Sequence, residues 1–346
     1  MQDKTELQAQ MLVNRLKKRF KHLKKWAQRT GTDAFRLYDR DIPEIPLVLD
    51  FYSDCICGSL YKRPYEKDEA DEIKWLSAMK DSITAALGIK SDNIYLKQRQ
   101  KQKGASQYEK LSGIKIEKII KESSLSFKVN LSDYLDTGLF IDRRLLRAMV
   151  RSEAFGKKVL NLFSYTGSFS VYAAAGRAAL TDSIDLSNTY LDWAKENFSL
   201  NGLPADIIKY YDDFFGKASR KTANTLLRAD VLDFLDRAVK AKMHWDIIIL
   251  DPPSFSNSKK MSNTLDLNRD LTELVCKCLK LLLPGGKIYL SINLRQSVPS
   301  SAELEAQLRL QLPQLNNIHV TDLGSKTIDE DFKDKKTPKS FLICKE

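Results

Sequence analysis

The sequence predicts an α/β fold with a buried parallel sheet, and three segments carry that prediction. Residues 245–253 form a continuous apolar run that ends in an aspartate and two prolines. Such a run is typical of a strand buried on both faces, and prolines end a strand because they lack an N–H group. Residues 159–163 are a second apolar strand, followed by a turn with Gly167 and an alanine-rich helix. Residues 179–185 are a third strand, which ends in an aspartate.

The chain opens with a predicted basic amphipathic helix. Residues 11–29 contain no acidic residue, and their apolar positions recur every three or four residues, as on one face of a helix. Gly31 is expected to end this helix. RNA phosphates and an anionic membrane are both suitable partners for its other face, and the rest of the chain favours RNA. That face carries Arg15, Lys17, Lys18, Lys21, Lys24, Lys25 and Arg29.

A small α/β module is predicted next. A hairpin is expected over residues 47–61 and a helix over residues 69–87, followed by short strands at residues 94–97, 115–120 and 125–129. The polar loop from residue 98 to residue 113 lies between the first two of these strands. It suits an RNA strand held by charge and stacking, and the alternative is an ordinary surface loop. Its candidate RNA-binding residues are Arg99, Lys101, Lys103 and Tyr108.

The remaining chain, from about residue 131, is predicted to form one larger domain. The expected order is the strand–turn–helix at residues 159–176, further strands at 179–184, 225–229, 245–250, 287–292, 318–323 and 341–344, and helices before residue 201 and over 265–283. Residues 204–224 are expected to be irregular. The predicted organisation is therefore a helix region at 1–40, an RNA-binding module at 41–130 and a Rossmann-like domain at 131–346.

The turn after residue 163 is a candidate cofactor site. A strand, a tight turn and a helix N-terminus bring backbone N–H groups close to a ligand. Asp185 lies eighteen residues after Gly167, the spacing of a carboxylate that binds a ribose diol. The turn has one glycine and not the three of dinucleotide-binding enzymes. The order of segments therefore favours S-adenosylmethionine (SAM) over NAD.

Composition narrows the class of protein and of partner. No apolar run is long enough for a membrane span, and residues 1–6 do not resemble a signal peptide. Five scattered cysteines fit reduced thiols in the cytoplasm, and neither they nor the three histidines suggest a metal site. The net charge is +11, of which residues 1–30 contribute +7 and residues 95–130 contribute +6. This placement favours a phosphate-backbone partner, and the alternative is a solvated basic surface.

Three motifs resemble one known family. Residues 133–140, 161–168 and 251–259 are similar to the guanine-N7 methyltransferase half of the fused bacterial 23S rRNA methyltransferase, the RlmK half of RlmK/L. The resemblance runs from about Asn14 to the C-terminus. It implies a class I SAM-dependent methyltransferase that acts on 23S rRNA or on a large-subunit assembly intermediate. The guanine-N2 half is not found, so the chain is expected to be a stand-alone version.

The resemblance also implies roles for individual residues. Asp142 and Arg143 are expected beside the methionine end of SAM, although Asp142 is also a candidate helix N-cap. Asp230 is expected at the adenine amino group, and a capping role with Asp233 is compatible with that. The cofactor turn is expected to comprise Phe163, Ser164, Tyr165, Thr166 and Gly167.

The chemistry expected at the Asp-Pro-Pro motif is alignment and not base catalysis. Guanine N7 carries a lone pair and no proton, and the methylated ring is cationic. Asp251 is therefore expected to orient the base and to balance its developing charge, in the frame set by Pro252 and Pro253. Phe255 is expected either to stack on a flipped base or to plug the end of the strand.

Two other functions remain open at this point. Cytosine-C5 methylation requires a cysteine thiolate, but Ser254 occupies the position beside the prolines. Cys276 and Cys278 fall in a predicted helix, and Cys344 falls in the last strand. A non-catalytic SAM-binding RNA chaperone is the alternative from another class, and incorporation of a methyl group distinguishes it from an enzyme.

Overall fold

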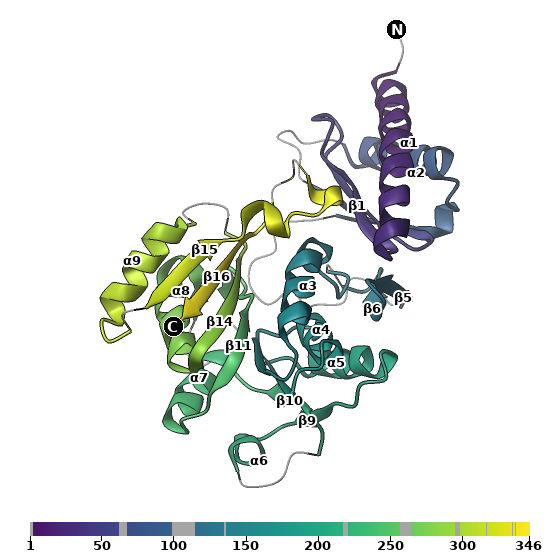
Figure 1. The fold of residues 1–346 in the computed structure, drawn as a ribbon. Helices are drawn as coiled ribbons and strands as arrows, with labels where there is room; N and C mark the ends of the chain where they lie inside the picture. The colour runs from purple at the N-terminus through teal and green to yellow at the C-terminus, as the bar shows by residue number, and fades with distance from the viewer. Residues whose placement is uncertain are drawn as a thin grey trace. The chain divides into compact units, whose positions relative to one another are not determined.

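The fold is described from a computed structural model. The structure describes residues 3–61, 68–98, 115–134, 136–216, 221–256, 264–294, 298–315, 317–333, 335 and 337–346. The chain divides into two compact units (Figure 1). The first unit comprises residues 1–137 with residues 330–335, and the second comprises residues 138–329 with residues 336–346.

The first unit combines two helices with a four-stranded sheet in the order β1-β2-β3-β4. The hairpin β2–β3 and the helix α2 lie where the sequence predicts them, and Gly88 ends α2 in a left-handed conformation. A separate hairpin, β5–β6, follows. The elements are α1 (Lys4–Thr30), β1 (Ala34–Asp39), β2 (Leu47–Tyr52), β3 (Cys55–Leu60), α2 (Glu69–Leu87), η1 (Ser91–Asn93), β4 (Ile94–Gln98), β5 (Glu117–Glu122), β6 (Leu125–Asn130) and η5 (Glu330–Phe332).

Helix α1 is part of the core of this unit. It begins at Lys4, earlier than predicted, because the Asp3 side chain accepts a hydrogen bond from the Thr5 N–H group and caps the helix. It ends as predicted at Gly31, whose φ is 67°. The predicted apolar stripe packs against residues of β1, β2 and α2. The predicted helix region 1–40 and the predicted module 41–130 thus contribute to one hydrophobic core. The buried residues of α1 are Gln8, Leu12, Leu16, Leu23, Trp26 and Ala27.

The second unit is built on an eight-stranded sheet in the order β15-β16-β14-β11-β7-β8-β10-β9. Strand β16 runs antiparallel to both of its neighbours, and the other pairs are parallel. The elements are η3 (Ile141–Arg143), α3 (Arg144–Glu153), β7 (Lys158–Leu162), α4 (Ser168–Ala175), β8 (Leu180–Asp185), α5 (Asn188–Leu200), β9 (Asp206–Ile208), α6 (Tyr211–Phe215), β10 (Asn224–Arg228), α7 (Val231–Lys240), β11 (Trp245–Leu250), β12 (Phe255–Ser256), β13 (Leu265–Asp266), α8 (Leu267–Lys280), β14 (Leu282–Ile292), α9 (Ser301–Gln311), β15 (Ile318–Asp322), η4 (Gly324–Thr327) and β16 (Lys339–Lys345).

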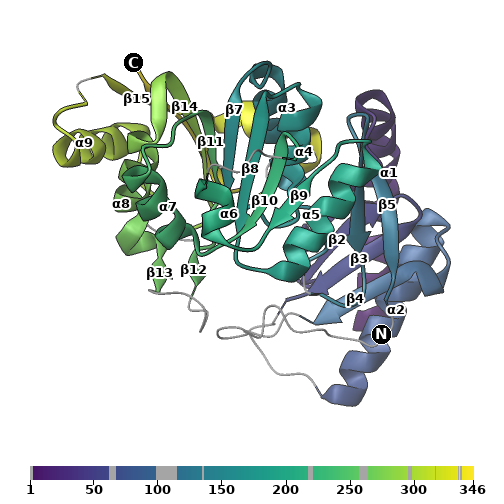
Figure 2. The same ribbon diagram turned by 90° about the horizontal axis from the view of Figure 1, so that it is seen from below.

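Helices cover both faces of this sheet (Figures 1 and 2). Side chains of α7, α8 and α9 pack on one face, against alternate residues such as Ile248 and Leu250 of β11. Side chains of α3 and α4 pack on the other face, against Ile247 and Ile249. Both faces of β11 are therefore buried, as its continuous apolar run predicts.

The order of the strands places a ligand site at β7 and β11. From β7 the chain passes through β8, β9 and β10 on one side, then returns to β11 on the other side of β7 and continues to β14. The loops after β7 and β11 therefore leave in opposite directions. Ligands of open α/β sheets bind at such a switch point, outside the carboxyl ends of the strands.

Other predicted segments also have different bounds in the structure. Residues 204–224 are not wholly irregular, because they contain β9 and α6, whose Phe214 packs against Phe234. Helix α8 begins at Leu267 and not at residue 265, since the Asp266 side chain accepts the Asn268 N–H and caps it. Strand β14 begins at Leu282, five residues before the predicted start. Within the described ranges, no helix has the length and apolar character needed to cross a membrane.

Candidate active site

The turn after β7 has an unusual backbone. Phe163 and Tyr165 have φ values of 55° and 50°, a left-handed conformation that bulky residues rarely adopt. Gly167, at φ 73°, leaves room for α5, because a Cβ there would lie 2.9 Å from that of Ala194. The Gly167 N–H donates to the Ser164 carbonyl at 2.8 Å and closes the turn directly before α4. Strained backbone of this kind is concentrated at ligand sites, and the sequence pattern alone did not predict it.

Asp185 ties this turn to the end of β8. Its Oδ2 accepts the Tyr165 N–H at 2.9 Å, and its Oδ1 accepts the Ser187 N–H at 2.9 Å. Desolvation at the sheet edge raises the pKa of Asp185 from 3.8 to about 6, although the backbone N–H groups of Ser187, Tyr165 and Leu186 oppose this shift. A carboxylate at this position has lone pairs left for hydroxyl donors, as binding of a ribose diol requires.

The raised pKa predicts that ligand binding depends on pH. Since the folded state holds the Asp185 proton more tightly than the unfolded chain does, the ligand-free protein loses stability as the pH rises from about 4 to 6. Ribose hydroxyls donate to the ionised form, so SAM affinity is expected to increase as the pH rises through about 6. Calorimetry over this range is expected to show proton release on binding below pH 6.

The matched variant is Asp185→Asn. It is expected to bind SAM more weakly than the wild type at neutral pH and to lose the pH dependence. The Asp185→Ala variant is expected to weaken binding while the circular dichroism spectrum stays native. A folded Asp185 variant with wild-type affinity would exclude this residue from the site.

Three buried polar atoms at this edge have no hydrogen-bond partner in the described structure. They are Asp142 Oδ1, Ser164 Oγ and Asp230 Oδ2. Asp230 follows β10, and its Oδ1 accepts the Leu232 and Asp233 N–H groups and caps α7, whereas its Oδ2 is buried without a partner. Buried polar atoms are costly when unpaired. SAM has an amino group at each end and two ribose hydroxyls between them, and these donors would satisfy the three atoms, so the residues present fit this cofactor.

A charged network lies at the end of β11. Arg143 donates from Nε to Asp251 Oδ2 at 3.2 Å and from Nη2 to Asp251 Oδ1 at 3.1 Å. Its Nη1 donates to Asp142 Oδ2 at 2.8 Å. The two carboxylates raise the pKa of Arg143 above its ordinary value. The predicted role of Asp142 as an N-cap of α3 is not observed, because the cap residue is Arg143 and no side chain caps that helix.

The aromatic residue of the Asp-Pro-Pro motif is open to solvent. Phe255 is 51% exposed in the short strand β12, which pairs with β13. A ring this exposed is accessible for stacking on a base, which is one of the two roles predicted for Phe255. The Ser254 hydroxyl donates to the Asn293 carbonyl at 2.6 Å, and it therefore links the loop after Pro252 and Pro253 to the end of β14.

Sequence reasoning missed a close contact behind the turn. Gly138, at φ 94°, lies against Trp193 of α5, and a Cβ there would be 2.2 Å from the indole ring. The Thr166 hydroxyl donates to the Gly138 carbonyl at 2.5 Å. The ring of Tyr165 packs between those of Phe140 and Tyr190, at 5.3 and 4.5 Å. The glycine after Thr137 was the available signal, because such a position requires a residue without a side chain.

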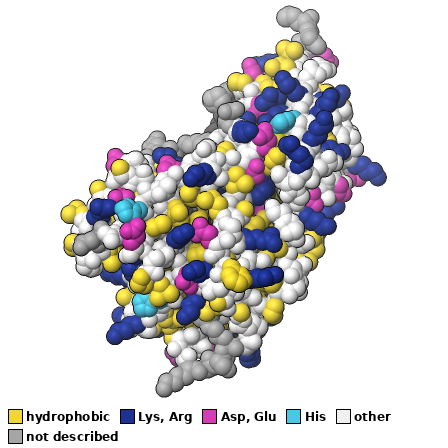
Figure 3. All heavy atoms as spheres, in the orientation of Figure 1, with side chains coloured by type: hydrophobic (Ala, Val, Ile, Leu, Met, Phe, Trp, Pro, Cys, Tyr) yellow, Lys and Arg dark blue, Asp and Glu magenta, His cyan; other side chains and the backbone are white. Residues whose placement is uncertain are grey.

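The predicted RNA-binding residues fall into two groups. Arg99, Lys101, Lys103 and Tyr108 lie outside the described residues. On α1 the lysines are exposed, and Figure 3 shows Lys and Arg side chains gathered over this helix. Arg15 is different, because its Nε is 2.7 Å from Oδ2 of the buried Asp41, which also pairs with Lys335. The exposed lysines are Lys17, Lys18, Lys21, Lys24 and Lys25.

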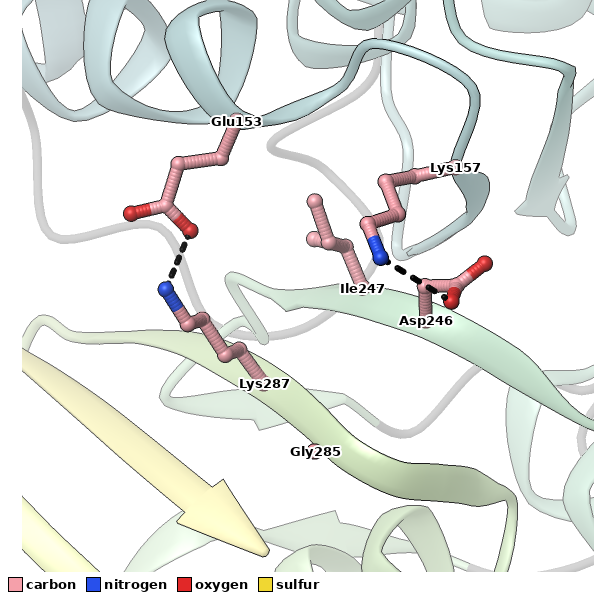
Figure 4. Close-up of a pocket in the computed structure, with 6 residues that line it drawn as sticks. All are labelled: Glu153, Lys157, Asp246, Ile247, Gly285 and Lys287. Carbon is pink, nitrogen blue, oxygen red and sulfur yellow. Dashed lines mark hydrogen bonds and ion pairs between the residues drawn. The ribbon is translucent and has the colours of Figure 1, made fainter.

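A pocket of about 390 Å³ lies at the amino ends of the parallel strands, opposite the end that carries the predicted site (Figure 4). Its lysines are already paired: Lys287 is 2.7 Å from Glu153 and Lys157 is 3.6 Å from Asp246. It lies at the amino ends of β7, β11 and β14, away from the predicted site. No cluster of three or more side chains suited to a metal ion occurs in the described part of the chain.

Comparisons with known proteins identify the family. The model of the S-adenosylmethionine-dependent methyltransferase family matches residues 36–319. The ribosomal RNA large subunit methyltransferase K of Neisseria meningitidis is 42% identical over 96% of this chain and 86% of that protein. The methyltransferase K/L of Shewanella pealeana is 41% identical over 93% of this chain. The chain covers only 41% of that longer protein.

Solved structures share the fold. The methyltransferase SMU.776 in complex with S-adenosylhomocysteine aligns with a TM-score of 0.70 at 24% identity, over 97% of this chain and 81% of that one. A SAM-dependent methyltransferase of Streptococcus mutans aligns with a TM-score of 0.69 at 23% identity, over the same shares of the two chains. With the family model spanning most of its length and relatives above 40% identity, the chain belongs to the S-adenosylmethionine-dependent methyltransferase family.

Proposed function

We propose that this enzyme methylates N7 of a guanine in 23S rRNA, on free rRNA or on a large-subunit assembly intermediate. The observation that carries the proposal is the site at the end of β11, where Asp251 is held by Arg143 beside the exposed Phe255. The names of the relatives, which are large-subunit rRNA methyltransferases, support the class of substrate. When bound, SAM supplies a methyl group activated by its sulfonium.

The cysteines argue against cytosine-C5 methylation. Burial raises the pKa of Cys55 and Cys276 to about 11, and it also raises the pKa of Cys278 and Cys344, so these thiols stay protonated. Cys344 pairs with Lys287, four residues along β14 from the level of Asp251, or about 13 Å. Cys57 is buried, and its thiol donates to the Leu131 carbonyl at 3.8 Å. The mechanism that requires a thiolate therefore has no candidate at Asp251.

The charges at the site suit a nucleophile without a proton. Both carboxylate oxygens of Asp251 already accept hydrogen bonds from the Arg143 guanidinium, so Asp251 is engaged in an ion pair and is not free to turn toward a proton of an amino group. Guanine N7 needs none removed. When all three groups are ionised, Asp142, Arg143 and Asp251 carry a net charge of −1, which favours a base that becomes cationic.

The rRNA is proposed to be held by basic residues of the first unit and by base stacking. The exposed lysines of α1 provide charge for the phosphate backbone, and Phe255 provides a face for the target base. Arg15 is left out of this surface because it pairs with Asp41. Arg99, Lys101, Lys103 and Tyr108 remain in the proposal on the strength of their sequence alone.

Nucleoside mass spectrometry tests the proposed function. Purified enzyme is incubated with labelled SAM and either 23S rRNA or large-subunit precursor particles, and labelled 7-methylguanosine is the expected product. A variant with all five cysteines changed to Ala is expected to give the same product if its circular dichroism spectrum is native. Labelled 5-methylcytidine, or a covalent adduct trapped with 5-fluorocytidine RNA, would establish the cytosine reaction instead. Absence of incorporation with both substrates would favour a non-catalytic RNA chaperone.

A further inference from the structure

We infer that Arg143 is a positioning residue that acts through Asp251 and does not itself bind SAM. The inference rests on the proposed methyl transfer at Asp251. It assigns to Arg143 a role different from the one that the sequence resemblance implies, which is contact with the methionine end of the cofactor.

The geometry of the ion pair supports this role. Both oxygens of Asp251 accept hydrogen bonds from one guanidinium, at 3.2 and 3.1 Å, so the plane of the carboxylate is fixed. The backbone of Asp251 is fixed separately, by β11 before it and by Pro252 and Pro253 after it. The side chain and the main chain of Asp251 are thus held by different elements, η3 and β11.

The side chains of Arg143 and Asp251 differ in their exposure to solvent. The side chain of Arg143 is 7% exposed and that of Asp251 is 18% exposed, so Asp251 is the more accessible partner. Three nitrogens of Arg143 are already used, two toward Asp251 and one toward Asp142. A ligand at this edge would meet the carboxylates and not the guanidinium. The atom left without a partner in this network is Asp142 Oδ1, which is the better candidate for a contact with SAM.

The consequence is that Arg143 affects the rate and not cofactor affinity. With its guanidinium removed, Asp251 is free to rotate, and misplacement of a group at the reacting centre by about 1 Å costs about 100-fold in rate. A lysine cannot replace the two parallel hydrogen bonds, because its ammonium is a single point charge. Arg143→Lys is therefore expected to retain only part of the rate.

The test compares Arg143→Met, Arg143→Lys and Arg144→Met with the wild type. Single-turnover rates are measured at saturating SAM and rRNA, and SAM affinity is measured by calorimetry. Arg143→Met is expected to lower the rate about 100-fold with little change in SAM affinity. Arg144 is the matched control: it is adjacent, its side chain is 3% exposed, and its Nη1 lies 2.9 Å from Asp329 Oδ2. Arg144→Met is expected to lower the melting temperature while the rate of the folded protein is retained.

A double-mutant cycle tests whether Arg143 acts through Asp251. Adding Arg143→Met to an Asp251→Asn background is expected to lower the rate little further, because the group it positions is already altered. A loss of SAM affinity that matches the loss in rate would overturn the inference. It would also be overturned if the double variant lost as much rate as the two single variants multiplied together. If Arg143→Met does not fold, the rate and the SAM affinity of Arg143→Lys test the inference in its place. A wild-type product other than 7-methylguanosine would contradict the proposed function alone, since the cycle can be measured on any methylated product.

Discussion

Replacing Asp251 with Asn is expected to lower the single-turnover rate by about 100- to 1000-fold, the usual loss when one preorganised polar group leaves a reacting centre. SAM affinity is expected to change little, because Asp251 is not among the residues proposed to hold the cofactor, which are Asp142 in η3 and residues that follow β7, β8 and β10. Asn keeps the shape of the side chain but lacks the charge that holds Arg143. Quenched single-turnover assays with labelled SAM measure the rate of methyl transfer, and calorimetry measures the affinity for SAM.

The matched control is Asp246→Asn, on the same strand. Asp246 lies at the amino end of β11, where it accepts the Lys158 N–H at 2.8 Å and pairs with Lys157. Its replacement removes one carboxylate from the same strand at the edge away from the site. The rate is expected to stay near that of the wild type. Equal losses in the two variants would show that β11 had been destabilised, and a near-normal rate in Asp251→Asn would exclude Asp251 from the reaction.

Much of the site could be predicted because its signals are local in the sequence. The strand–turn–helix at residues 159–176 and the aspartate that ends β8 follow one another within thirty residues, and each local pattern has a structural cause. The left-handed backbone of Phe163 and Tyr165 could not be predicted in this way. It depends on contacts with other elements, including the carboxylate of Asp185, which holds the Tyr165 N–H.

The pairing of Arg143 with Asp251 could not be predicted at all. The two residues are 108 positions apart, and neither periodicity nor composition indicates which acid a buried arginine will meet. The sequence placed both residues at the carboxyl edge of the sheet but gave each a separate partner. The same limit applies to α1, whose apolar stripe was predicted although its place in the core of the first unit was not. Residues that pack across elements require the three-dimensional arrangement.

Reversing the charge of Lys17, Lys18, Lys24 and Lys25 to Glu is expected to weaken rRNA binding about 100-fold or more at low salt. These lysines are exposed on α1, and among the described residues no carboxylate pairs with them. Each phosphate contact releases a counterion, so the loss of four contacts is expected to reduce the slope of log affinity against log salt by about 3 to 4. Filter binding at several salt concentrations measures both values.

The control variant changes the same number of charges in the second unit. Lys195, Lys240, Lys242 and Lys280 are exposed there, and their change to Glu alters the net charge equally. If the net charge of the protein alone attracted RNA, the two variants would bind rRNA equally weakly. A surface on α1 predicts a much larger loss from the first variant, with SAM affinity unchanged in both because the cofactor residues are untouched. Binding by the α1 variant with wild-type affinity and salt dependence would show that the face is only a solvated surface.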